Sequence, residues 1–125
     1  MTTVLLIEDE ETSRELTVIA LQRLGITDIV LAEDGKKAIK VLDGLATKPD
    51  VVISDIMMPN KDGVEIVSAL VARKFQGGLI LLSGADPNIL RMTTTMAAHG
   101  GVNVLATLIK PLDEKALKYA FDRLN

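Results

Sequence analysis

Short apolar segments alternate along the chain with longer segments in which apolar residues recur at helical spacing. The apolar segments are predicted strands, at residues 4–7, 29–32, 51–55, 79–82 and 104–109. The segment at 51–55 is apolar up to its last two residues and shows no polar alternation. This pattern is typical of a strand covered on both faces at the centre of a parallel sheet.

A predicted helix follows each strand. The first begins at a capping box formed by Thr12 and Glu15 and has an apolar stripe that ends at Gly25, formed by Leu16, Ile19, Ala20 and Leu24. The other predicted boundaries are Asp34 as cap of the second helix, Asp62–Gly63 and Gly77–Gly78 around the third, Asp86–Pro87 and Gly100–Gly101 around the fourth, and Asp113 as cap of the fifth. The right-handed crossover rule folds this α/β pattern, (βα)5, into a doubly wound parallel sheet with helices on both faces.

Length and composition narrow the class of protein. The 125 residues correspond to one domain, 1–125, and the formal net charge of −3 with scattered lysines and arginines argues against direct nucleic-acid binding. The absence of cysteine excludes disulfides and thiolate metal sites, and no apolar run is long enough to cross a membrane. The N-terminus lacks the charged start of a signal peptide, so we expect a cytoplasmic protein.

Four of the five predicted strands end in polar side chains that carry chemistry. They are Glu8–Asp9, Asp55, Ser83 and Lys110. Because ligands of open α/β sheets bind at the carboxyl ends of the strands, these side chains form a predicted site. The clustered carboxylates repel one another, and all-oxygen ligation suits magnesium, Mg2+. Lys110 supplies a compact positive charge and Ser83 a hydroxyl donor for a phosphate oxygen.

At this point the sequence resembles the receiver domain of bacterial response regulators over essentially its whole length. The resemblance is carried, in this order, by Ile7-Glu8-Asp9-Glu10, Ser54-Asp55-Ile56-Met57-Met58-Pro59, Asp62-Gly63, Leu82-Ser83-Gly84 and Ile109-Lys110-Pro111. It implies a flavodoxin-like receiver fold with strand order 2-1-3-4-5 and a cis Lys110–Pro111 bond. It also implies two-component signalling, in which a histidine kinase or phosphotransfer protein phosphorylates the domain.

The resemblance also assigns roles to single residues. Asp55 would accept the phosphoryl group, Ser83 would contact it and Lys110 would pair with it. Magnesium would be bound by Asp9, Asp55 and the backbone carbonyl of Met57, with Glu8 holding a coordinated water. The expected protein is a phosphorylation-controlled signalling domain that catalyses only its own aspartyl phosphorylation and dephosphorylation. It would regulate an output domain or partner through the helix after Pro87, the strand at 104–109 and the last helix.

Two departures from the family pattern bear on signalling. The position three residues before the lysine, usually Tyr or Phe in the family, is Thr107, so an aromatic switch is not expected here. The segment between Ser83 and Lys110 is longer than usual, and residues 103–112 resemble receivers fused to EAL-type cyclic-di-GMP phosphodiesterases.

The same residues are compared with the requirements of other classes of protein. A magnesium phosphatase with an aspartate nucleophile would need a second Asp where this chain has Met57. A flavin carrier is disfavoured because Glu8 to Glu11 would repel its phosphate. A receiver-like interaction module that works without phosphorylation stays open because of Thr107. Glu10 and Glu11 fit first-turn helix acids better than ligands, and His99 fits an exposed helix end.

Overall fold

The computed structural model describes residues 2–56, 62–84 and 87–124, which form alternating strands and helices. The strands are β1 (Thr3–Ile7), β2 (Asp28–Ala32), β3 (Val51–Asp55), β4 (Gly78–Ser83) and β5 (Asn103–Ile109). The helices are α1 (Glu11–Arg23), α2 (Gly35–Gly44), α3 (Asp62–Ala72), α4 (Pro87–His99) and α5 (Glu114–Asp122). This alternation confirms the predicted (βα)5 pattern. The expected cap at Asp86 lies outside the described residues.

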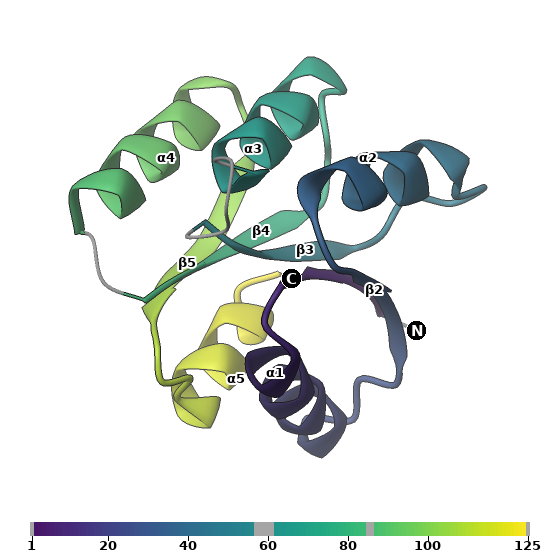
Figure 1. Cartoon of the computed structure of the whole chain (residues 1–125), viewed down its shortest axis with the longest axis vertical. Coiled ribbons are helices and arrows are strands. Elements are labelled where there is room, and N and C mark those ends of the chain that lie inside the picture. Colours follow the sequence, from purple (N-terminus) through teal and green to yellow (C-terminus); the bar gives the residue numbers. More distant parts are fainter. Residues whose placement is uncertain (1, 57–61, 85–86, 125) are drawn as a thin grey trace.

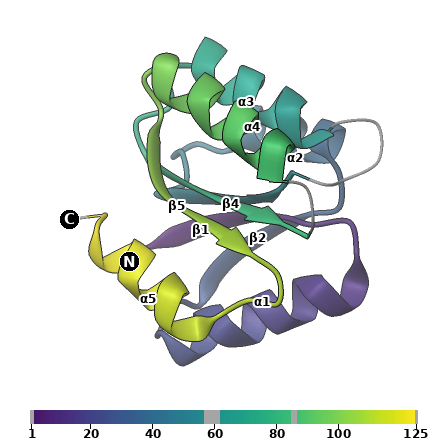
Figure 2. The same cartoon turned by 90° about the vertical axis from the view of Figure 1, so that its left-hand side faces the viewer.

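The strands form one parallel sheet in the order β2-β1-β3-β4-β5, which confirms the order that the resemblance implied. Helices α2, α3 and α4 cover one face, and α1 and α5 cover the other (Figures 1 and 2). Strand β3 is central, and all its residues are buried. No described helix is long and apolar enough to span a membrane.

Each face of the sheet has its own apolar core. On β1, Leu5 and Ile7 belong to the core under α2, α3 and α4, whereas Val4 and Leu6 belong to the core under α1 and α5. Successive side chains of a strand point to opposite faces. A strand between two helical layers therefore needs apolar residues at every position, which accounts for the unbroken apolar segments of the sequence.

The start of α1 differs from the prediction. Glu10, rather than Thr12, is the N-cap, and its carboxylate accepts the backbone N–H groups of Thr12 at 3.1 Å and Ser13 at 2.6 Å. These bonds lower the pKa of Glu10, the bond from Ser13 most. The capping box at Thr12 and Glu15 is therefore wrong by two residues, because an extended glutamate before the helix reaches the same N–H groups.

The buried face of α1 matches the predicted stripe only in part, at Ala20 and Leu24. Thr17, Ala20 and Leu21 face the core, while Leu16 and Ile19 are 59% and 44% exposed. Thr17 can be buried because its hydroxyl donates to the Ser13 carbonyl at 2.9 Å, which satisfies the polar group within the helix. The exposed leucine and isoleucine are left on the outer surface of α1.

The end of α3 is not made by the glycine pair. The helix stops at Ala72, and Lys74 adopts a positive φ of 52°, while Gly78 is already the first residue of β4. A Cβ on Gly77 would lie 2.4 Å from the Asp50 carbonyl oxygen, so this position needs glycine for close packing. The predicted closure of α3 by Gly77–Gly78 is therefore wrong.

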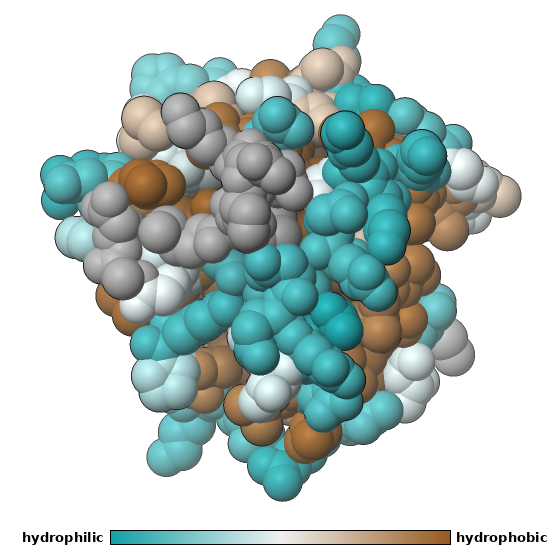
Figure 3. Space-filling model, viewed as in Figure 1, coloured by the Kyte–Doolittle hydropathy of each residue, from teal (hydrophilic) through white to brown (hydrophobic). Residues whose placement is uncertain are grey.

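The two edge strands are more exposed than the inner ones. On β5, Thr107 and Ile109 are exposed, and the pairing with β4 shifts by one residue at Leu105. Arg123, the C-cap of α5, donates to the Leu105 carbonyl at 2.7 Å and so secures this irregularity. On β2, Leu31 is 48% exposed, and Figure 3 shows apolar surface over this edge.

Candidate functional site

The predicted site residues lie at the carboxyl ends of four strands. Glu8 follows β1, Asp55 ends β3, Ser83 ends β4 and Lys110 follows β5. Asp55 is in register with Leu82, so Ser83 extends one residue beyond it on the neighbouring strand. The backbone N–H of Lys110 donates to the Ser83 carbonyl at 2.9 Å, which holds the ends of β4 and β5 together.

Three carboxylates meet at this edge. Glu8, Asp9 and Asp55 each offer an oxygen, and these oxygens lie within 4.8 Å of one another. Glu8 has no exposed surface and Asp55 only 4%, whereas Asp9 is exposed. Clustered oxygen donors with one side open to solvent fit a hard divalent cation that keeps several waters, such as magnesium. Of the expected direct ligands, the Met57 carbonyl lies outside the described residues.

Lys110 is the positive group of the cluster. Its Nζ lies 2.6 Å from Glu8 Oε1 and 2.8 Å from Asp55 Oδ2, so one ammonium bridges both buried carboxylates. Burial would lower the pKa of Lys110, but the hydrogen bonds to Asp55 and Glu8 outweigh burial and raise that pKa. Lys110 is therefore charged across the physiological range.

Among the described residues, the charges of the cluster are only partly balanced. Burial first, and then contact with the Asp55 carboxylate, raise the pKa of Glu8, although Lys110 and Ser13 act in the opposite direction. One ammonium faces two buried carboxylates and the exposed Asp9. An added cation would relieve the remaining repulsion.

Two residues of α1 that the sequence analysis did not single out also contact Glu8. The Ser13 hydroxyl donates to Glu8 Oε1 at 2.5 Å, and Arg14 Nη1 donates to the Glu8 carbonyl at 3.0 Å. These contacts could have been expected from the short connection between the end of β1 and the start of α1, because it brings the first turn of α1 back over the site.

The surroundings of the site agree with several further expectations. The Lys110–Pro111 bond is cis, as the resemblance implied. His99 is an exposed residue at the end of α4, as expected. Glu11 lies in the first turn of α1, as expected for a helix acid.

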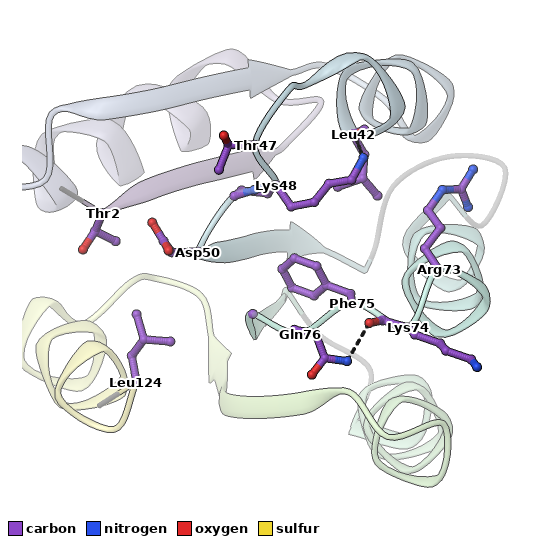
Figure 4. Close-up of a pocket in the computed structure, with 12 residues that line it drawn as sticks. Thr2, Leu42, Thr47, Lys48, Asp50, Arg73, Lys74, Phe75, Gln76 and Leu124 are labelled. Atoms are coloured by element: carbon purple, nitrogen blue, oxygen red, sulfur yellow. Dashed lines mark hydrogen bonds between the residues drawn. The ribbon is translucent and has the colours of Figure 1, made fainter.

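The pockets of the described residues do not coincide with the carboxylate cluster. A hollow of about 760 Å³ lies at the opposite, amino-terminal edge of the sheet, where Phe75, Asp50 and Lys48 line it (Figure 4). A groove of about 360 Å³ runs between α1 and the connection from β5 to α5 and includes Ser13 and Lys110 in its lining. Only the second adjoins the carboxylate cluster, so volume alone is a poor guide to the chemistry here.

Comparison with known proteins gives a consistent result. The pattern of the response regulator receiver domain matches residues 4–122. The chain is 32% identical over 123 residues to the probable chemotaxis protein CheY of Rhizobium etli, covering 95% of this chain and 88% of that protein. It is 30% identical over 122 residues to the cyclic di-GMP phosphodiesterase RocR of Pseudomonas aeruginosa, covering 98% of this chain and 31% of RocR.

A solved structure shows the same fold. The crystal structure of a response regulator from Colwellia psychrerythraea superposes with a TM-score of 0.82 at 26% identity, covering 99% of this chain and 97% of that one. The chain spans about a third of the length of the first curated relatives that it matches, RocR among them. On the match over residues 4–122, the chain belongs to the family of response regulator receiver domains.

Proposed function

We propose that this domain, spanning residues 1–125, accepts a phosphoryl group on Asp55 from a histidine kinase or phosphotransfer protein and thereby regulates an output domain or partner. The observation that carries the proposal is the position of Asp55. Its carboxylate is almost fully buried at the end of the central strand, 2.8 Å from Lys110 and beside Glu8 and Asp9. Because receiver domains are signalling modules, phosphorylation of Asp55 would act as a signal that changes the domain rather than as a metabolic reaction.

The proposed chemistry is a phosphoryl transfer. An oxygen of Asp55 attacks the phosphorus of a phosphohistidine, the phosphorus–nitrogen bond breaks, and the imidazole nitrogen leaves with the bonding electrons. Lys110 pairs with the negative oxygens of the phosphoryl group, and the Ser83 hydroxyl donates to one of them. Catalysis is then mainly positioning and charge neutralisation.

Magnesium fits the same site. Asp9, Asp55 and the Met57 carbonyl would bind it, with Glu8 holding one of its waters. When bound, it would supply positive charge to the phosphoryl oxygens. The fold supports magnesium binding because it buries Glu8 and Asp55 in a cluster whose negative charge is larger than the positive charge of Lys110.

The groove beside the site suggests where the phosphoryl donor docks. Exposed Leu16 and Ile19 of α1 line it together with Pro111 and Leu112, and it includes Lys110 at its edge. A helix of the donor laid in this groove would bring its phosphohistidine close to Asp55. The exposed apolar residues of α1 would then be covered on binding.

Exposed apolar side chains also support the proposed output surface. Met92 of α4, Ile109 of β5 and Tyr119 of α5 are 58%, 65% and 69% exposed. Elements α4 and α5 flank β5 on opposite faces of the sheet, so the three residues come from neighbouring elements (Figure 2). An output domain of the EAL phosphodiesterase type is one candidate, given the likeness to RocR.

Wild-type protein incubated with acetyl phosphate and magnesium should gain the mass of one phosphoryl group, because acetyl phosphate can replace the donor. Intact mass spectrometry measures the gain, and the same reaction with EDTA in place of magnesium is the control. No gain in either reaction, with the protein folded, would favour the alternative of an interaction module that works without phosphorylation. The ion pair between buried Asp55 and half-buried Lys110 gives that alternative no support.

The response to phosphorylation should be carried by the β4–α4 side of the domain. Thr107 is too small to fill space vacated by a moving loop, and α4 contains three successive threonines, Thr93 to Thr95, which weaken its helical propensity. Adding the phosphate mimic beryllofluoride with magnesium should shift backbone amide NMR signals most from Ser83 through His99 and less near Thr107. Large shifts in α1 with α4 unchanged would contradict this.

A further inference from the structure

The buried Glu8 carboxylate receives two hydrogen bonds on the same oxygen. Lys110 Nζ donates to Oε1 at 2.6 Å and the Ser13 hydroxyl at 2.5 Å, while Oε2 receives a long contact of 3.5 Å from the Glu10 N–H. The side chain is therefore held through one oxygen, and the other is more weakly engaged. A carboxylate without exposed surface cannot replace either donor by bulk water.

The start of α1 fixes Ser13 in place. The backbone N–H of Ser13 donates to Glu10 Oε2 at 2.6 Å, and the next residue, Arg14, donates to the Glu8 carbonyl at 3.0 Å. The Ser13 carbonyl accepts the buried Thr17 hydroxyl. The first turn of α1 is thus held by hydrogen bonds to Glu8, Glu10 and Thr17, and this places the Ser13 hydroxyl against the Glu8 carboxylate.

We propose that Ser13 is a positioning residue, whose hydroxyl holds the Glu8 carboxylate in the orientation that receives a magnesium-bound water. This inference rests on the proposed function, because it concerns the same magnesium site. It assigns a role to α1 that the strand ends alone do not provide.

Lys110 and Ser13 both donate to Glu8 but differ in what else they bind, and this difference supports the assignment. Lys110 bridges Glu8 and Asp55 in this structure, and in the proposed reaction it also pairs with the phosphoryl group. A hydroxyl has one proton to donate, and that of Ser13 goes to Glu8. When Lys110 turns toward the phosphoryl group, Ser13 keeps the buried carboxylate bonded and oriented.

The test is magnesium affinity, measured by NMR titration of the backbone amides with magnesium chloride at constant ionic strength. Ser13→Ala should weaken magnesium binding roughly tenfold, the lower end of the usual effect of removing an outer-shell partner. Ser13→Thr keeps a hydroxyl and should bind within about twofold of wild type. Ser68→Ala removes an exposed hydroxyl from α3 and should leave the affinity unchanged.

The outcomes separate this inference from the proposed function. If wild type binds magnesium and Ser13→Ala binds equally well, the role of Ser13 is overturned while the magnesium site stands. If wild type shows no saturable binding, the magnesium site fails and the role of Ser13 fails with it. Because an affinity is read from folded protein, a loss of stability in Ser13→Ala does not imitate the expected result.

Discussion

Asp55→Asn should abolish phosphorylation by acetyl phosphate and magnesium, the largest functional effect expected of a single substitution here. The amide is a far poorer nucleophile than the carboxylate. Among the other described carboxylates, only Glu8 is likewise buried and bonded to Lys110, and Glu8 already accepts the Ser13 hydroxyl. Intact mass spectrometry of wild type and variant, side by side, measures the difference.

The control for this substitution is Asp122→Asn, which changes an exposed carboxylate of α5 in the same way and should leave phosphorylation intact. The wild-type adduct should be stable in acid and labile in base, as expected for an acyl phosphate. A persistent gain of mass in Asp55→Asn, mapped to a serine or threonine, would refute the assignment of Asp55.

Much of this site could be predicted because strand ends in a parallel sheet gather by topology alone. Once residues 51–55 are a central strand, Asp55 must emerge at the edge where Glu8 and Lys110 also emerge. No side-chain detail is needed for that step. The fold followed for a similar reason, since apolar strands covered on both faces leave few arrangements for the helices.

What could not be predicted is which residues of α1 face the core. The predicted stripe is right at Ala20 and Leu24, which pack in the core. Thr17 and Leu21 are buried in place of the expected Leu16 and Ile19. Local bonds decide between them: Glu10 caps the helix, and the Thr17 hydroxyl is satisfied by the Ser13 carbonyl. The contact of Ser13 with Glu8 depends on the same local bonds, so it too was missed.

The end of α3 was mispredicted for a different reason. Glycine often ends a helix because it tolerates a positive φ. Here Lys74 takes that conformation, while Gly77 is required by the close approach of the Asp50 carbonyl. Two physical demands select glycine, and the sequence does not say which one applies.

Lys110→Ala should lower the stability of the metal-free protein by up to about 3 kcal/mol, because it leaves two buried carboxylates without their half-buried cation. The ammonium is the bridge between Glu8 and Asp55, and without it two buried carboxylates face each other with Asp9 nearby. Urea unfolding of wild type and variant in EDTA measures the loss. Lys115→Ala, which removes an exposed lysine of α5, should change stability little.

Magnesium should restore much of the stability of Lys110→Ala, because a cation bound by the carboxylates replaces the missing positive charge. The gain on adding magnesium should therefore be larger in Lys110→Ala than in wild type. Lys110→Met, which keeps most of the apolar stem, separates the loss of charge from the loss of packing.

Phosphoryl uptake should remain possible in Lys110→Ala, but the NMR shifts caused by beryllofluoride should be smaller than in wild type. Equal stability of Lys110→Ala and Lys115→Ala in EDTA would show that Lys110 does not balance the buried carboxylates.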